Sequence, residues 1–521
     1  MTRTTPTGPT RTMPTSPALD DAIHRRRWPI LAVLSLAVFV TVLDGTIVNV
    51  ALPTLAVDLD ATTRQLQWIV DAYLLVFTGL LLAAGGLGDR YGRKRMLVAG
   101  LAVFGATSAL AGSVDSAQGL ILGRALMGTG AALIFPATLA IITNVFRDPG
   151  ERAKAIGIWS AVTGLAVAAG PVSGGWLLEH FWWGSIFFVN VPVVIVALVA
   201  TVLIVPESKE AGAPRLDIGG IVLSIAAITT LVYSIIEAPE WGWLDPKTLA
   251  GFALAAILLV AFVLWELRLE HPMLPVGIFR NLRFSAASVS VTSAFFALFG
   301  FIFLITQYFQ LVKTYTPLQA GVRTLPVAAA IAVASIVAPR VVERIGTARV
   351  VAAGLGLMSS AFVWIGMTTD VDTSYLVIAG QMVVLGSGLG LTTAPATESI
   401  MGSLSRDKAG IGSAVNDTTR ELGGTLGVAI IGSVFSSLYI GSLDSAGGVF
   451  GSLPPELQDA TSESVGAAKV VAGRLGADAP AYLAQVNDAF LSGLHVGCFV
   501  CAGVAAAGAV FALRFIPARA I

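Results

Sequence analysis

The chain has 521 residues, of which 55% are hydrophobic and only 12% are charged, against about 25% charged residues in an average soluble domain. Lys and Arg balance Asp and Glu at 32 each, so no excess of positive charge points to a nucleic-acid partner. This composition excludes a disordered, collagen-like or disulfide-rich secreted chain, argues against a soluble enzyme, and is typical of an all-α polytopic membrane protein.

Fourteen apolar stretches have the length of about 20 residues that a helix needs to cross the hydrocarbon core. Before them, residues 1–28 are rich in Thr and Pro near their start and are expected to form a disordered tail without a cleavable signal peptide. The stretches fall into groups of six, two and six. They are predicted at 29–51, 66–87, 96–113, 119–142, 153–177 and 183–205, then 218–236 and 249–267, then 284–308, 318–339, 350–367, 375–396, 410–439 and 489–515.

This grouping predicts an N-terminal six-helix bundle and a C-terminal six-helix bundle separated by two inserted helices. The last two spans are joined by a long connection rich in Gly, Ala and Ser, in which a short helix is expected around 463–475. The predicted parts are 29–205 for the first bundle, 206–283 for the linker with the inserted helices, 284–515 for the second bundle with its 440–488 loop, and 516–521 for the tail.

The distribution of Lys and Arg predicts the orientation in the membrane. With the N-terminus inside, 24 of the 32 basic residues lie in cytoplasmic segments, six lie on the outer side, and Arg124 and Arg420 lie within spans. An even number of spans then places both termini in the cytoplasm. We expect the protein in the cell membrane, either the plasma or the inner membrane.

Two segments 254 residues apart indicate an internal repeat. Residues 85–95 read GGLGDRYGRKR after the second span, and residues 339–349 read PRVVERIGTAR after the tenth. At this offset an acidic residue, an Arg and a Gly coincide, and the fourth and twelfth spans each carry a Gly-x-Gly followed by Pro-Ala. Two related six-helix halves around a central cavity are a common design of secondary transporters.

Four motifs resemble those of the major facilitator superfamily, and more narrowly the fourteen-span drug:proton antiporters of the EmrB/QacA type. Besides 85–95, they are LGRALMGTG at 122–130, GLAVAAGPVSGG at 164–175 and LDGTIVNVALP at 43–53; FFVNVP at 187–192 also fits. The resemblance implies the major facilitator fold and drug export in exchange for protons. The second half departs from the first, because Met382 stands where Arg124 would repeat.

Charged residues inside spans are candidate coupling sites, because a charge at the bilayer centre costs at least about 2.5–3.5 kcal/mol. A carboxyl group in an apolar cavity favours its protonated form, so proton and cationic drug can compete for it. Another interpretation is that these acids join helices and are neutralised by Arg, Ser or Thr. The candidates for proton and substrate coupling are Asp44, Asp71, Arg124, Asp417, Arg420 and Glu421, whereas Glu398 at a span end is expected to be solvated.

Two further motifs have proposed mechanical roles. The resemblance implies a cytoplasmic gate at the repeated loops, although a basic loop that only sets topology explains the same residues. The fifth-span motif predicts a hinge or a tight seam, with small-residue helix packing as the alternative. The gate residues are Gly88, Asp89, Arg90, Gly92, Arg93, Glu343 and Arg344, and those of the antiporter motif are Gly164, Gly170, Pro171, Gly174 and Gly175.

The sequence therefore predicts a proton-coupled antiporter that exports lipophilic, cationic drugs or antibiotics by alternating access. The alternatives are an exporter of an endogenous metabolite, antibiotic or lipid, or a proton-coupled nutrient symporter on the same fold. An enzyme is not expected, since no catalytic constellation, phosphate loop or metal-ligand cluster stands out, and Cys498 and Cys501 lie alone in an apolar span. We expect no cofactor and no obligatory protein partner, only a small-molecule substrate, protons and the bilayer.

Overall fold

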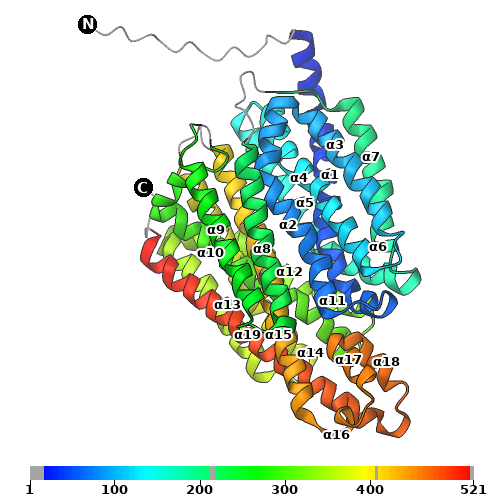
Figure 1. Ribbon diagram of the computed structural model, residues 1–521. Coiled ribbons are helices and arrows are strands. Elements are labelled where there is room, and N and C mark those ends of the chain that lie inside the picture. Colours follow the sequence, from blue (N-terminus) through cyan, green and yellow to red (C-terminus); the bar gives the residue numbers. More distant parts are fainter. Residues whose placement is uncertain (1–16, 210–216, 271, 405–408, 517–521) are drawn as a thin grey trace.

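The computed structural model describes residues 17–209, 217–270, 272–404 and 409–516. The described residues contain helices and no β-strand. Figure 1 shows that the long helices run between two ends of the molecule. We call the end that holds residues 90–95 the basic face and the opposite end, which holds residues 447–478, the cap face.

The helices of the first half begin and end at residues that the sequence marks. Thr62 caps α2 in a capping box with Gln65, and Asp148 caps α5, whose first residue is Pro149. The helices are α1 (Pro17–Asp58), α2 (Thr63–Tyr91), α3 (Arg93–Ala111), α4 (Ala117–Val145), α5 (Pro149–His180), α6 (Ser185–Phe188), α7 (Asn190–Ile204), and the inserted α8 (Ile218–Trp241) and α9 (Pro246–Glu266).

The second half repeats the pattern of long helices and adds several short ones on the cap face. Its helices are η1 (Val276–Arg280), α10 (Leu282–Gln307), the π-helical η2 (Tyr308–Val312), α11 (Pro317–Arg323), α12 (Leu325–Ile345), α13 (Thr347–Thr368), α14 (Tyr375–Gly402), α15 (Ala409–Ala446), α16 (Gly448–Gly451), α17 (Pro455–Glu463), α18 (Val465–Ala472), η4 (Gly476–Asp478) and α19 (Ala479–Phe515).

The fold class and the fourteen predicted spans are confirmed. Thirteen helical segments of the described residues are long and apolar enough to cross a membrane, and α2, which bends by 52° between Leu81 and Ala83, makes fourteen when it is counted as one span. The chain is therefore a multi-pass membrane protein.

Three boundaries differ from the expectation. Helix α1 begins at Pro17, so residues 17–28 are helical where a disordered tail was expected, and the rest of that tail lies outside the described residues. Helix α15 continues to Ala446 and α19 begins at Ala479, so the 440–488 loop is shorter than expected. The short helix expected at 463–475 is α18. Helices extend past the apolar stretches because polar residues outside the membrane can continue a helix that is already nucleated.

The glycine positions confirm the internal repeat in three dimensions. Gly92 and Gly346, 254 residues apart, both have positive φ angles, of 114° and 87°, and each joins two long helices. A Cβ atom on Gly128 of α4 would lie 2.6 Å from the carbonyl oxygen of Tyr73, and one on Gly386 of α14 would lie 2.4 Å from that of Val327. Tyr73 and Val327 are again 254 residues apart. The same close helix approach is therefore built in both halves.

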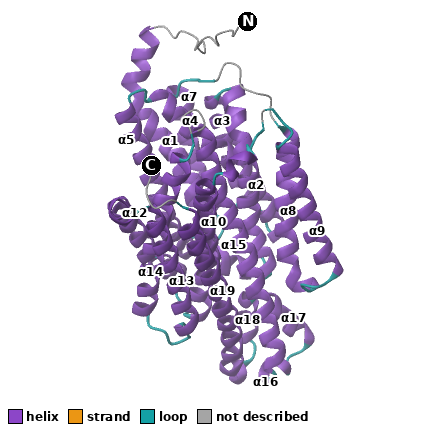
Figure 2. Ribbon diagram, turned by 90° about the vertical axis from the view of Figure 1, so that its left-hand side faces the viewer, coloured by secondary structure: helices purple, strands orange, loops and turns teal. Residues whose placement is uncertain are grey.

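The inserted helices α8 and α9 lie side by side at one edge of the molecule, as Figure 2 shows. A small apolar cluster joins α8 to the two bundles; it contains Leu75 of α2, Val232, Ile235 and Ile236 of α8, and Ala429 of α15. The insertion therefore covers the seam between α2 and α15.

The hydrogen bonds that join the two bundles in the described residues lie toward the cap face. Gln310 of η2 donates to the Val50 carbonyl of α1 at 2.8 Å, and Gln67 of α2 donates to the Ala429 carbonyl of α15 at 3.3 Å. Within the described residues, no hydrogen bond or ion pair joins the two bundles near the basic face. These bonds hold the two bundles together at the cap-face end of the molecule.

Candidate functional site

A buried ion pair forms the centre of the N-terminal half. Arg124 of α4 and Asp44 of α1 are 1% and 0% exposed, and their Nη1 and Oδ2 atoms lie 2.5 Å apart. Asn190 of α7 donates to the other oxygen of Asp44 at 2.8 Å. We call Asp44, Arg124 and Asn190 the N-terminal charge site. The structure brings Asp44 and Arg124 together, while their role in coupling stays a prediction.

The surroundings of the N-terminal charge site hold the Arg124 side chain in one position. Its Nε atom donates to the Ile69 carbonyl at 3.1 Å, and its guanidinium lies 4.3 Å from the centre of the Tyr73 ring. Asn190 also donates to the Ser108 hydroxyl at 3.1 Å. Each charged group thus has several partners, which a buried ion pair needs to offset its desolvation.

Asp71 of α2 is in the opposite situation. It is 0% exposed, and neither carboxylate oxygen has a hydrogen-bond partner among the described residues. It lies one turn after Gln67, which contacts α15, so the two side chains share the face of α2 that lies toward the seam between the bundles. A carboxylate ion in such surroundings is costly unless it binds a proton or meets water in another conformation.

The second group of charges lies on α15. Asp417, Arg420 and Glu421 are partly exposed, and none of them forms an ion pair within 4.0 Å in the described part of the chain. Arg420 donates to the Thr397 hydroxyl at 3.1 Å and lies 5.5 Å from the centre of the Phe295 ring. We call Asp417, Arg420 and Glu421 the C-terminal charge cluster.

Tyr73 lies beside the N-terminal charge site. Its hydroxyl donates to the Thr41 carbonyl of α1 at 3.1 Å, and its ring contacts Arg124. Tyr73 was missed in the sequence, because the rotation of a helix about its axis leaves no mark in the composition.

The turn between α2 and α3 holds the predicted gate residues. Asp89 forms an ion pair with Arg93 inside the turn, with Oδ1 2.8 Å from Nη2. A Cβ atom on Gly92 would lie 2.7 Å from the Glu207 carboxylate, which accepts from the Lys94 backbone at 3.1 Å. Glu207 was missed in the sequence, although it is the first acid after the sixth span.

The remaining gate residues do not cross between the bundles. Arg90 lies 5.6 Å from the centre of the neighbouring Tyr91 ring, and a Cβ atom on Gly88 would meet only Arg93. Glu343 and Arg344 are exposed, and neither takes part in an ion pair within the described residues. The structure therefore brings together only the residues of the first turn.

The antiporter motif on α5 packs against both bundles. Cβ atoms on Gly170 and Gly174 would clash with Thr46 and Ile47 of α1, which shows how closely α1 and α5 approach. Toward the other bundle, a Cβ atom on Gly175 would lie 2.5 Å from the backbone of Leu318 in α11.

The other two residues of the motif differ from each other. The Pro171 carbonyl lies 2.1 Å from where a Cβ atom on Gly321 of α11 would be, so Pro171 belongs to the seam between the bundles. Gly164 has nothing within 4 Å of its Cβ position. Four of the five predicted motif residues thus form tight contacts, and Gly164 does not.

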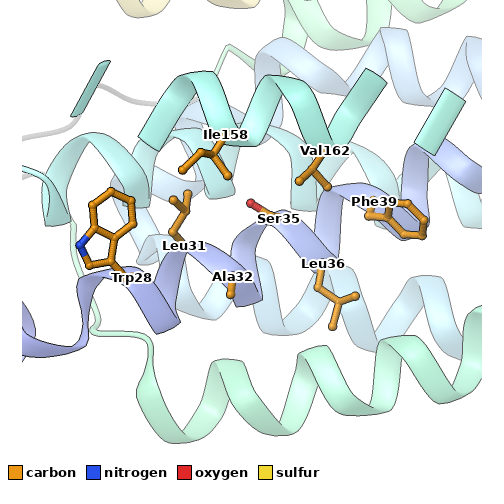
Figure 3. Close-up of a pocket in the computed structure, with 8 residues that line it drawn as sticks. All are labelled: Trp28, Leu31, Ala32, Ser35, Leu36, Phe39, Ile158 and Val162. Carbon is orange, nitrogen blue, oxygen red and sulfur yellow. The ribbon is translucent and has the colours of Figure 1, made fainter. Parts of the chain in front are cut away.

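An apolar groove of about 520 Å³ lies between α1 and α5 toward the basic face (Figure 3). Ser35 is 4% exposed, and its hydroxyl has no hydrogen-bond partner. The groove can accept an apolar ligand or a lipid chain. It is lined by Trp28, Leu31, Ala32, Ser35, Leu36, Phe39, Ile158 and Val162.

The remaining residues singled out in the sequence are two cysteines and Glu398. Cys498 and Cys501 are buried free thiols, and the described residues contain no group of three His, Cys, Asp or Glu side chains that could hold a metal ion. Glu398 is exposed, as its place at a span end predicts.

Comparison with known proteins identifies relatives along most of the chain. The family model described as Major Facilitator Superfamily matches residues 34–428. The multidrug efflux pump LfrA of Mycolicibacterium smegmatis is 36% identical over 94% of this chain and 96% of its own length. The tetracenomycin C resistance and export protein of Streptomyces glaucescens is 34% identical over 94% and 92%. The methyl viologen resistance protein SmvA of Salmonella typhimurium is 36% identical over 80% and 84%.

Solved structures share the fold at low sequence identity. A bacterial homologue of the human lysosomal transporter Spinster, in an inward-facing and unoccupied conformation, has a TM-score of 0.68 at 17% identity and covers 95% of this chain and 98% of its own. The nucleoside transporter NupG has a TM-score of 0.59 at 10% identity and covers 94% and 100%.

Proposed function

The chain belongs to the Major Facilitator Superfamily, and from that premise we propose that it exports lipophilic, cationic drugs or antibiotics from the cytoplasm in exchange for protons. Its relatives include a multidrug efflux pump, an antibiotic export protein and a methyl viologen resistance protein. An enzymatic activity is not part of this function.

The observation that carries the proton coupling is the set of acidic side chains inside the spans without a cationic partner. Asp71 is buried with both oxygens unpartnered, and Asp417 and Glu421 have no ion pair within 4.0 Å in the described residues. Such a carboxyl group binds a proton or a cationic substrate, and each excludes the other. Export follows when the proton is taken up from outside and released inside.

The N-terminal charge site supplies a fixed framework for this exchange. The Asp44 and Arg124 charges neutralise each other and are held by Asn190, so this pair costs too much to separate in each cycle. Tyr73 contacts Arg124 and donates to the Thr41 carbonyl, so it belongs to the same framework. Each proton that moves inward down a membrane potential of 100 mV releases about 2.3 kcal/mol of free energy.

The fold supports a cycle of alternating access. In the conformation described, the bundles meet at the cap face through Gly175 and Gln310, and we assign this conformation to the state of the cycle that is open toward the basic face. We assign the basic face to the cytoplasm, which places both termini inside, and the protein to the cell membrane. The turn that pairs Asp89 with Arg93 serves as the gate that closes this side when the cap face opens.

The apolar groove between α1 and α5 favours a lipophilic substrate. It lies toward the proposed cytoplasmic side and is lined almost entirely by carbon atoms. The proton gradient replaces any cofactor as the source of energy, and a single chain suffices for transport.

A second candidate is export of an antibiotic or other metabolite made by the same cell. The likeness to the tetracenomycin C resistance and export protein favours it. The chemistry is the same and only the cargo differs. A nutrient symporter fits less well, because the motif at 164–175 is associated with exporters.

Transport by the purified protein in liposomes tests the proposal. We expect an imposed pH gradient to drive ethidium or methyl viologen across the membrane, and a protonophore to abolish the flux. A flux that a protonophore leaves unchanged contradicts proton coupling. Accumulation in the direction of the proton flow would identify a symporter. No flux for a panel of lipophilic cations and for tetracenomycin-like aromatic compounds contradicts the export function.

A further inference from the structure

A polar pocket of about 430 Å³ lies on the cap face, at the point where α13 ends beside the longer α19. Residues 367–370 form one wall, and the other wall is the face of α19 that carries Asp488, Ser492 and His495 at helical spacing. We call it the cap-face pocket. It lies away from both groups of charges described above, and the transport mechanism does not use it.

The polar groups around the cap-face pocket are mainly hydrogen-bond acceptors. Asp370 and Asp488 contribute carboxylates, and both residues are exposed to solvent. The last carbonyls of α13 add the negative end of a helix dipole. His495 contacts the Thr369 carbonyl through Nε2 at 2.7 Å, so in the neutral ring that donates this bond, Nδ1 is left as an acceptor.

A buried hydroxyl gives an independent indication of a ligand. Thr369, which lines the cap-face pocket, is 2% exposed, and its hydroxyl has no hydrogen-bond partner in the part of the chain that the structure describes. The backbone of the same residue is satisfied, since its N–H donates to Ile365 and its carbonyl contacts His495. Buried polar groups are rarely left unpaired, so the hydroxyl is expected to meet a ligand or water.

A cation lies near the cap-face pocket but is already engaged. Lys313 Nζ donates to the carbonyls of Val371 and Thr373 at 2.6 and 2.8 Å. It forms no ion pair with Asp370 within 4.0 Å, and no Lys or Arg side chain lines the pocket in the described part of the chain. The carboxylates are therefore left to attract a cation from solution.

We propose that the cap-face pocket binds a small organic ammonium ion, with its charge between Asp370 and Asp488 and one N–H donated to Thr369. The volume suits a ligand with one small ring or a short alkyl chain, and Leu491 in the wall contacts its apolar part. This site does not rest on the proposed function, because its walls come from the end of α13 and from α19 and contain none of the proposed coupling residues.

Charge-selective labelling of Ser492→Cys tests the proposal on the purified protein. The native Cys498 and Cys501 are buried, and the unsubstituted protein measures their background. We compare the rates of a cationic reagent, aminoethyl methanethiosulfonate, and an anionic one, sulfonatoethyl methanethiosulfonate. Ser445→Cys, exposed on the cap face at the end of α15, is the reference position. The cation:anion rate ratio is expected to be at least about tenfold higher at Ser492→Cys than at the reference.

Further variants and a protection experiment test whether the charge selectivity arises in the cap-face pocket. Asp488→Asn is expected to remove the selectivity, and Asp444→Asn, which removes an exposed charge from the same face, is expected to leave it unchanged. Benzylammonium is expected to protect Ser492→Cys from the reagent, and benzyl alcohol is not. Thr369→Val, which breaks no hydrogen bond, is expected to weaken this protection.

The opposite results overturn the proposal. A rate ratio equal to that at Ser445→Cys means that the pocket has no preference for cations. Equal protection by benzyl alcohol means that the pocket is merely apolar. Protection that survives both Asp488→Asn and Thr369→Val places the amine elsewhere. Each readout is independent of ion gradients, so failure here leaves the export proposal intact, and loss of export leaves this proposal intact.

Discussion

The two groups of charges inside the spans are built in different ways. In the N-terminal charge site, Asp44 and Arg124 are fully buried and each has at least two partners. In the C-terminal charge cluster, Asp417, Arg420 and Glu421 are partly exposed and, in the described residues, form no ion pair within 4.0 Å. The halves share a backbone plan but differ in these side chains, since Met382 takes the place of Arg124 in the second half.

This difference in burial and pairing indicates that one group of charges has a structural role and the other exchanges protons for substrate. A buried pair gains its stability only while both partners stay, because one ion left alone in an apolar interior is very costly. A group that trades a proton for a drug must change its charge in every cycle. We therefore assign the framework to the N-terminal charge site and the exchange to the C-terminal charge cluster together with Asp71.

The largest expected effect tests the framework. Arg124→Met leaves the Asp44 ion without its partner and is expected to lower the free energy of unfolding by about 3–5 kcal/mol. Arg420→Met is the matched control and is expected to cost about 1 kcal/mol or less, because Arg420 is partly exposed and has no ion pair within the described residues. Denaturant unfolding in detergent micelles measures both.

A double variant sharpens this test. Adding Asp44→Asn to Arg124→Met removes the stranded charge, so much of the lost stability is expected to return. Equal stability of Arg124→Met and Arg420→Met would contradict the comparison, and so would a double variant no more stable than Arg124→Met alone.

The second prediction concerns the exchange. Asp417→Asn and Glu421→Gln are each expected to slow pH-driven efflux in liposomes by more than about tenfold, the equivalent of about 1.4 kcal/mol. Their free energies of unfolding are expected to change by about 0.5 kcal/mol or less, because neither carboxylate has an ion pair to lose in the described structure. Substrate counterflow without a pH gradient is expected to persist. Full pH-driven efflux by both variants would assign the exchange to other acids.

The third prediction concerns the seam between the two bundles on the cap face, where α5 packs against α11. Alternating access requires this seam to open. Gly175→Ala places a Cβ atom 2.5 Å from the backbone of Leu318 and is expected to destabilise the closed cap face by about 1–3 kcal/mol. Gly164→Ala is the control, since its Cβ meets nothing within 4 Å. Spin labels at His180→Cys and Gln319→Cys report the distance across the seam. We expect longer label-to-label distances in Gly175→Ala but not in Gly164→Ala. The same distance distribution in both variants would contradict the prediction, because it would show that the seam accommodates the added methyl group without opening.

The sequence was sufficient for the fold and for the inventory of charges, but not for their partners. Span lengths and the 254-residue repeat predicted the architecture, because hydrophobicity and glycine positions are local properties. The pairing of Asp44 with Asn190, the lack of a hydrogen-bond partner for Asp71 among the described residues and the contact of Tyr73 with Arg124 depend on the rotation of each helix. No residue pattern records that rotation. The Asn in FFVNVP, one polar residue in an apolar run, was the best available signal for Asn190.

The smallest expected effect comes from Lys469, a charged residue that lies outside the spans on the cap face and belongs to neither group of charges. Lys469 of α18 is half-buried, donates to the Gln310 carbonyl at 3.0 Å, and has its pKa lowered by burial. The pKa of Lys469 is therefore lower in the folded chain than in the unfolded chain. Below the folded-state pKa the side chain is charged in both states, and its burial lowers the free energy of unfolding. This loss of stability disappears as the pH rises from the folded-state pKa to the ordinary pKa of Lys. Thermal unfolding between pH 8 and 10.5 is expected to show this gain in the native protein relative to Lys469→Met. The same pH dependence in both proteins would mean that Lys469, like Arg420, is solvated well enough to carry its charge without cost.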